Sequence, residues 1–143
     1  MRKLMPLRVP AGWAILFNTF VEFPPHEPPT PAEIEAFRGE DILSAQRIIY
    51  TDDGWKVDMS AHVIDLGWYP GGDADGRYRL CLARDGWNDI PVQFEHRDCY
   101  VIRNAFDTLT RMLSEGKRLS LIARVLADPR FPQLPGGPPA APA

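Results

Sequence analysis

SAHVIDLGWYPGGDADGRYRLCLAR, residues 60–84, has the clearest strand pattern in the chain. Apolar side chains alternate with other residues before and after a segment at 70–76 that is rich in Gly, Asp and Pro. Alternation with a period of two is typical of half-buried strands, and such a segment between two strands is typical of a turn. The stretch therefore predicts an antiparallel hairpin. One face of the first strand is predicted to carry His62, Ile64, Leu66 and Trp68, and one face of the second is predicted to carry Tyr78, Leu80 and Leu82.

Upstream residues predict further strands and one short helix. Residues 13–23 are rich in aromatic and β-branched side chains, which predicts a long first strand. The prolines of residues 24–31 predict an extended loop, after which Thr30 and Pro31 predict a capped helix over 32–37. Residues 40–44 are expected to add another helical turn. Residues 45–59 predict a second hairpin, because Asp53-Gly54 supplies the positive φ angles of a tight turn.

Downstream, residues 91–95 predict a short edge strand, because Pro91 has no N–H to donate to a ladder. Asp98 is a typical helix N-cap, and the next apolar residues recur at spacings of three and four until Gly116. Residues 120–127 predict a second, shorter helix. We therefore expect an α+β fold, in which an antiparallel sheet of four to five strands carries one main C-terminal helix on one face.

The length of 143 residues favours a single domain over residues 1–128, followed by a proline-rich tail over 129–143 that is extended or disordered. Apolar residues are 45% and charged residues 24%, as in ordinary globular proteins. No apolar run approaches the roughly 20 residues that cross a bilayer, so we expect a cytoplasmic protein without a membrane partner. Cys81 and Cys99 are expected to be reduced and buried.

Charge is distributed unevenly along the chain. Residues 9–76 contain twelve acidic side chains and three basic ones, although the net charge of the chain is only −3. Nucleic-acid binding depends on clustered Lys and Arg, so an acidic half argues against a nucleic-acid partner. It suits a basic protein, although the same imbalance also keeps a protein soluble.

The familiar catalytic and metal-binding motifs are incomplete. Asp73 and Asp75 resemble the opening of a calcium loop, but the fifth and twelfth positions hold Arg77 and Arg84 in place of oxygen ligands. The three histidines do not have metal-ligand spacing, and no Gly-rich phosphate loop leads from a strand into a helix. The sequence therefore predicts no catalytic residue, no metal site and no cofactor.

Aromatic side chains accompany acidic turns. Large rigid rings anchor many protein interfaces, and carboxylates beside them favour a basic partner. This combination predicts a protein-binding surface on a monomer or weak dimer. The residues predicted to contribute to it are Asp52, Asp53, Trp55, Asp65, Trp68, Tyr69, Asp73, Asp75 and Trp87.

A central motif has a counterpart in a known family. It comprises Asp65-Leu-Gly-Trp-Tyr-Pro70, Asp73, Gly76-Arg-Tyr78, Leu80, Trp87, Pro91, Phe94 and Arg97. On these residues, the chain resembles small bacterial immunity proteins that accompany polymorphic toxins, including those of contact-dependent growth inhibition, over residues 10–115. It departs from them in the proline loop, the proline tail and His96.

The resemblance implies a cytoplasmic inhibitor that neutralises a cognate toxin, often a nuclease, by covering its basic active-site cleft. Two alternatives come from the residues. A small hydrolase or ligand-binding domain would use the cluster Glu95-His96-Arg97-Asp98, since His and a carboxylate together perform acid–base chemistry. A scaffold module would dock through the proline tail.

Overall fold

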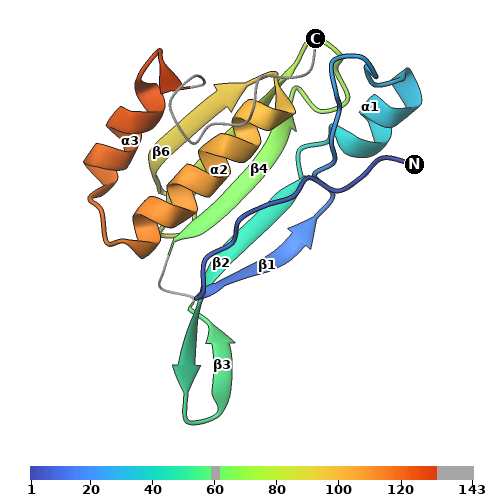
Figure 1. Cartoon of the computed structure of the whole chain (residues 1–143). Helices are drawn as coiled ribbons and strands as arrows, with labels where there is room; N and C mark the ends of the chain where they lie inside the picture. The colour runs from blue at the N-terminus through green and yellow to red at the C-terminus, as the bar shows by residue number, and fades with distance from the viewer. Residues whose placement is uncertain (59–61, 132–143) are drawn as a thin grey trace.

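The structure is a computed structural model that describes residues 1–58 and 62–131. Six strands form one antiparallel sheet, in which five lie in the order β1-β2-β4-β5-β6 and β3 pairs with β2 (Figure 1). The helices α2 and α3 lie on one face of this sheet. The expected α+β class is confirmed, and the sheet has one strand more than predicted. The elements are β1 (Trp13–Asn18), α1 (Pro31–Phe37), β2 (Leu43–Thr51), β3 (Gly54–Val57), β4 (Val63–Tyr69), β5 (Arg77–Arg84), β6 (Asp89–His96), α2 (Cys99–Ser114) and α3 (Leu119–Ala127).

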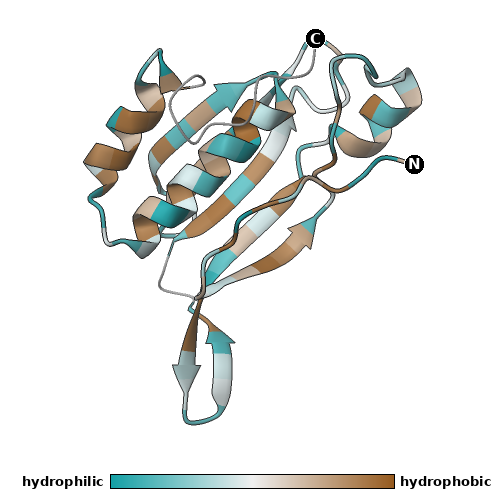
Figure 2. Cartoon of the chain, viewed as in Figure 1, coloured by the Kyte–Doolittle hydropathy of each residue, from teal (hydrophilic) through white to brown (hydrophobic). Residues whose placement is uncertain are grey.

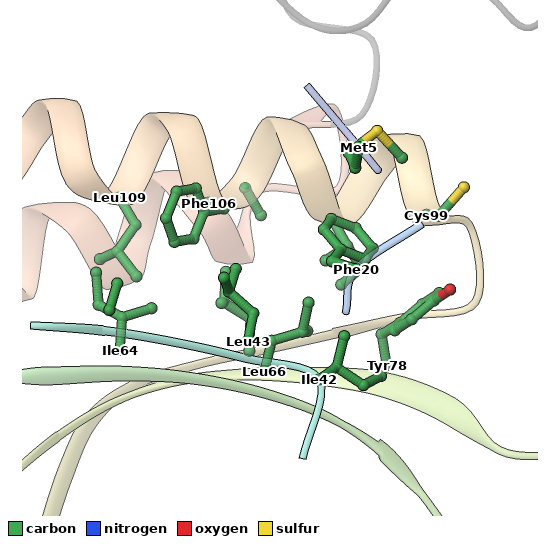
Figure 3. Close-up of a cluster of buried hydrophobic side chains, with 14 of the residues drawn as sticks. Met5, Phe20, Ile42, Leu43, Ile64, Leu66, Tyr78, Cys99, Phe106 and Leu109 are labelled. Atoms are coloured by element: carbon green, nitrogen blue, oxygen red, sulfur yellow. The ribbon is translucent and has the colours of Figure 1, made fainter. Parts of the chain in front are cut away.

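The β4–β5 hairpin forms the centre of the sheet, as the alternation of residues 60–84 predicts; residues 60 and 61 lie outside the described part. Its strands pair from Val63↔Ala83 to Tyr69↔Arg77. Successive side chains of a strand point to opposite faces, so Ile64, Leu66, Leu80 and Leu82 share the buried face. Hydrophobic residues predominate in the middle of these strands, with hydrophilic ones among them and at their ends (Figure 2). Figure 3 shows part of the resulting core, in which residues of four elements and of the N-terminal segment meet. Among them are Met5, Phe20, Leu43, Ile64, Leu66, Phe106 and Leu109, all buried.

Helix α2 begins and ends where the sequence predicts. The Asp98 side chain accepts hydrogen bonds from the backbone N–H groups of Tyr100 (2.7 Å) and Val101 (3.4 Å), which have no partner within the helix. Gly116 follows the helix with a φ of 74°, a conformation that costs glycine little. The apolar stripe of α2 packs on β5 and β6, and α3 packs beside it on β6.

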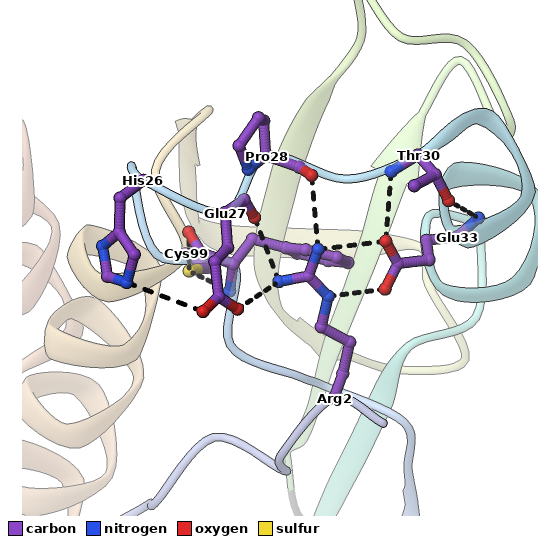
Figure 4. A network of polar contacts seen from close by, with 8 residues as sticks. Arg2, His26, Glu27, Pro28, Thr30, Glu33 and Cys99 are labelled. Atoms are coloured by element: carbon purple, nitrogen blue, oxygen red, sulfur yellow. Dashed lines mark hydrogen bonds and ion pairs between the residues drawn. The ribbon is translucent and has the colours of Figure 1, made fainter.

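The N-terminal segment holds the proline loop against α1 (Figure 4). Thr30 and Glu33 form a reciprocal capping box at the start of α1, as Thr30 and Pro31 predict. The guanidinium of Arg2 donates to both carboxylate oxygens of Glu33 and to the backbone carbonyls of Glu27 (3.0 Å) and Pro28 (3.2 Å). Hydrogen bonding to Arg2 lowers the pKa of Glu33 to about 2. The loop is therefore fixed by one side chain.

Two local predictions upstream are wrong. The first strand ends at Asn18 rather than at residue 23, because the Asn18 side chain accepts a hydrogen bond from the N–H of Phe20 (2.9 Å) and turns the chain. The turn at Asn18 takes Phe20 into the core. Residues 43 and 44 belong to β2 and form no helical turn, since their backbones pair with β1 and β4.

The predicted edge strand is confirmed, since β6 lies at one edge of the sheet and β1 at the other. Phe131, which the sequence assigns to the tail, is buried, and its ring meets that of Phe94 edge-on at 5.4 Å. Residues 132–143 of the predicted tail lie outside the described residues.

Candidate interaction surfaces

The predicted site residues lie at both ends of the sheet. Strand register places Gln46, Val63 and Ala83 level with one another. The turns at 52–53 and 85–88 follow this level at one end, whereas the loop at 70–76 follows Tyr69 at the other end. Six residue steps along β4 separate the two levels, which is about 20 Å at roughly 3.3 Å per residue. The sheet therefore divides the predicted acidic and aromatic turns into two groups.

One group lies on a hairpin arm, defined here as residues 48–57. The arm extends past the start of β4, because β4 pairs with β2 only from Leu43 to Gln46 (Figure 1). Tyr50 and Trp55 are 73% and 66% exposed, and their ring centroids lie 5.3 Å apart in an edge-on arrangement. Asp52 and Asp53 are exposed at the tip, where Asp53 pairs with Lys56 at 3.2 Å. The arm thus combines two exposed rings with two carboxylates.

Trp87 lies in the β5–β6 turn at the same end and is 51% exposed. Its φ of 78° and that of 55° at Asp85 place both residues in the left-handed region, which non-glycine residues rarely adopt. Arg84 and Asp89 form an ion pair beneath the turn. Trp87 therefore stands exposed on a turn whose base is held by this pair.

At the other end, Trp68 is fully buried, so its predicted role as an exposed anchor is wrong. Its ring packs edge-on against Tyr78 at 4.8 Å, and its Nε1–H donates to the backbone carbonyl of Asp73 at 2.6 Å. The guanidinium carbon of Arg38 lies 4.1 Å from the centroid of the Trp68 ring. Trp68 alternates in register with Ile64 and Leu66, and this pattern in the sequence already indicates the core.

The loop at 70–76 presents exposed carboxylates but is internally held. The Asp73 side chain accepts a hydrogen bond from the N–H of Asp75 (2.8 Å), and Arg97 donates to the carbonyl of Ala74 (2.9 Å). With Trp68 buried, Tyr69 is the one predicted ring that remains partly exposed at this end. Its ring lies under the Arg79 guanidinium, 4.5 Å from the guanidinium carbon to the ring centroid.

Asp65 lies on the sheet face opposite to α2 and α3, because Ile64 and Leu66 on either side of it point toward the helices. We call this side the open face. Ser44, Asp65, Cys81 and Gln93 stand side by side across four strands of it. Burial, and secondly the charge of Asp41, raises the pKa of Asp65 to about 6 from an ordinary 3.8.

A cavity of about 310 Å³ opens on this face between β1 and β4. Ser44 is small, and it stands between Phe17 of β1 and Asp65 of β4 in the strand register, so a hollow remains above it. The residues around the cavity are Phe17, Asp41, Ile42, Leu43, Ser44 and Asp65. Asp41 was not among the predicted site residues, and no motif in the sequence relates it to Asp65.

The alternative cluster is spread over two faces. Glu95 pairs with Arg79 at 2.9 Å on the open face. His96 follows it and points the other way, with its ring stacked on Phe94 and its Nδ1 accepting from the N–H of Asp98 at 3.0 Å. The Asp98 carboxylate caps α2. Strand alternation thus separates Glu95 from His96, and the Asp98 carboxylate is engaged by the first N–H groups of α2.

Both cysteines are free and buried, as expected. Cys81 faces the open side of the sheet and Cys99 begins α2 on the other side, and burial raises the pKa of each thiol to about 11. Among residues 1–58 and 62–131, no group of three or more His, Cys, Asp or Glu could hold a metal ion. No helix in the same ranges has the length and apolar character needed to cross a membrane.

No family model, no curated protein and no solved structure matches the chain. The likeness to immunity proteins therefore rests on the central motif alone. Any functional conclusion has to come from the surfaces of the chain itself.

Proposed function

We propose that this protein is a cytoplasmic immunity protein that binds a basic toxin domain and covers its active site. The observation that carries the proposal is the hairpin arm, which holds two largely exposed aromatic rings beside two exposed carboxylates. The two rings lie in contact on the exposed arm, and Tyr and Trp dominate the binding energy of many interfaces.

The carboxylates and the rings of the arm would contribute to binding in different ways. Nuclease clefts that bind phosphate are basic, so the acidic tip attracts the cleft over a Debye length of about 8–10 Å before contact. The paired rings of Tyr50 and Trp55 then bury apolar area at little conformational cost, because each has only two side-chain torsions and already packs on the other. Occlusion of the cleft would exclude substrate without any chemistry on the part of the inhibitor.

Co-expression tests the function directly. The product of the neighbouring toxin gene should co-purify with this chain and should stop killing cells when the chain is present. A neighbouring gene product that neither binds nor is neutralised would remove the proposal. The scaffold alternative predicts binding that is lost when residues 132–143 are deleted, whereas the immunity proposal predicts binding that survives the deletion.

Replacing the two rings of the arm should weaken toxin binding strongly. Trp55→Ala and Tyr50→Ala are each expected to raise the Kd by about 30-fold or more, in line with hot-spot losses of about 2 kcal/mol. Because both rings are exposed, the free energy of unfolding should change by less than about 0.5 kcal/mol. Calorimetric titration with the purified toxin measures the Kd. Leu121→Ala, an exposed apolar truncation on α3, is the matched control and should bind normally.

Charge reversal should reveal which end of the sheet faces the toxin. The double variant Asp52→Lys, Asp53→Lys should slow association by about tenfold at low salt and flatten its salt dependence. The double variant Asp73→Lys, Asp75→Lys changes the charge equally at the other end and should leave the association rate within about twofold. Stopped-flow measurements at several salt concentrations compare them. The reverse order of effects would move the interface to the loop at 70–76.

A further inference from the structure

We propose that the cavity on the open face is a binding site for a guanidinium group, and that its occupant is an arginine side chain of the basic protein partner. That the arginine belongs to a protein partner rests on the proposed function. That the site binds a guanidinium group is argued from the cavity alone. The hollow lies between β1 and β4, away from the hairpin arm, and adds a second contact that the sequence does not indicate.

The volume of the cavity admits a planar cationic group. About 310 Å³ equals the liquid volume of roughly ten water molecules at about 30 Å³ each, which leaves space for a guanidinium and its last methylene groups. The hollow exists because Ser44 is short while its register neighbours Phe17 and Asp65 are long. Its shape is therefore set by three paired strands.

The charge of the cavity is negative and uncompensated. No described cation forms an ion pair with Asp65, and the charge of the second carboxylate, Asp41, raises its pKa further. Arg79, in the next row of the open face, is engaged by Glu95 at 2.9 Å and by the ring of Tyr69. A partly buried carboxylate that faces another acid weakens the fold when it ionises. Such an arrangement is typical of a site that a cationic ligand completes.

The wall of the cavity favours arginine over other cations. Phe17 is 46% exposed, so its ring offers an apolar face on which a guanidinium can stack while its N–H groups reach the carboxylates. Ca²⁺ takes six to eight oxygen ligands, and two carboxylates with one hydroxyl supply too few. A lysine ammonium is more strongly hydrated and gains less from the ring.

Protonation of Asp65 should compete with the ligand. Its pKa of about 6 means that the carboxylate is ionised at pH 7.5 and largely protonated at pH 5. The titratable or charged groups around it are Asp41 from the segment before β2, Cys81 and Arg79 from β5, and Tyr69 from its own strand. Cys81, with a pKa raised to about 11, and Tyr69, whose pKa is raised by burial, stay neutral in this range. Between pH 5 and 7.5, protonation of Asp65, and not of Cys81 or Tyr69, therefore competes with arginine binding.

The sign of the stability effect is opposite to that of a normal ion pair. The folded state holds the Asp65 proton more tightly than the unfolded chain, so stability falls as pH rises from about 4 to about 6 and is flat above. Asp65→Asn should remove this slope and raise the denaturation midpoint at pH 7.5. The same variant should no longer bind arginine. A gain in stability together with a loss of binding would show that Asp65 serves binding rather than folding.

N-acetyl-arginine amide is the probe, titrated into the ¹⁵N-labelled full-length protein and followed by amide chemical shifts. We expect shifts centred on Ser44 and Asp65 at pH 7.5, at least tenfold weaker binding at pH 5, and at least tenfold weaker binding to Asp65→Asn. The control Asp75→Asn, an exposed aspartate in the loop at 70–76, should bind as the wild type does. The uncharged citrulline analogue should not bind.

Three results would overturn the cavity inference: equal binding of the citrulline analogue, equal binding of the probe to Asp65→Asn, or tighter competition by CaCl₂ than by the probe. The toxin experiment distinguishes this failure from failure of the proposed function. A toxin that binds wild type and Asp65→Asn equally would refute the cavity and leave the immunity function standing. If the probe binds as expected but no toxin partner is found, the cavity inference stands and the immunity function is refuted.

Discussion

Trp68→Ala is expected to lower the free energy of unfolding by about 4 kcal/mol, the largest loss from any single truncation considered. The ring is fully buried between Tyr78 and Arg38, and truncation of a buried Trp costs about 3–5 kcal/mol through lost burial and the cavity left behind. The guanidinium of Arg38 is itself nine-tenths buried and rests on this ring, and its Nε has no hydrogen-bond partner. Removal of Trp68 therefore also deprives a buried cation of its main contact.

Urea denaturation measures this loss, and Trp68→Phe is the matched control. Phenylalanine keeps a ring in the core but cannot donate to the carbonyl of Asp73, which should cost about 1–2 kcal/mol. An alanine variant as stable as the phenylalanine variant would show that the indole contributes only its hydrogen bond.

Gly67→Ala is expected to cost about 3 kcal/mol or more. A Cβ atom at Gly67 would lie 2.1 Å from the backbone oxygen of Glu40 and 2.8 Å from the ring of Tyr69. The Glu40 backbone cannot move freely, because the residues on either side of it bond to β4: the Ile42 N–H donates to Leu66 O (2.9 Å) and the Trp68 N–H donates to Gly39 O (2.8 Å). Overpacking against such a fixed backbone is at the upper end of its usual cost.

Gly39→Ala is the control, because nothing lies within 4 Å of a Cβ at that position. It should change stability by less than about 1 kcal/mol, with a small gain expected from the reduced freedom of the unfolded chain. The segment that Gly67 admits also carries Asp41, so Gly67→Ala should weaken binding of the arginine probe as well. Equal denaturation midpoints for the two alanine variants would contradict the close approach.

The parts of the fold that could be predicted are those with local chemistry. Alternation over the β4–β5 hairpin, the Asp-Gly turn before β3 and the Asp98 cap of α2 each act within a few residues, so sequence spacing reveals them. The first strand is shorter than predicted because the Asn18 side chain ends it, and this turn does not change the apolar pattern of residues 13–23.

The candidate site was harder to predict because it depends on long-range pairing. The Asp52 and Asp73 turns lie at opposite ends because β3 pairs only with β2 and β4 then lies beside β2, and the spacing of apolar residues does not reveal this strand order. The burial of Trp68 could have been predicted, since it shares the alternation of Leu66. The meeting of Asp41 with Asp65 could not, because β2 brings together residues with no common motif.

Strand β1 leads us to expect that chains pair edge to edge at high protein concentration. It is an edge of the sheet, its six residues carry no charge, and Leu16 and Phe17 are exposed on it. Nothing on such a strand repels the same strand of another molecule, and its outer backbone groups can extend a neighbouring sheet. Titrations run dilute report on one molecule, whereas crowded samples would also report on chains joined edge to edge, with Phe17 and the adjoining cavity near the seam.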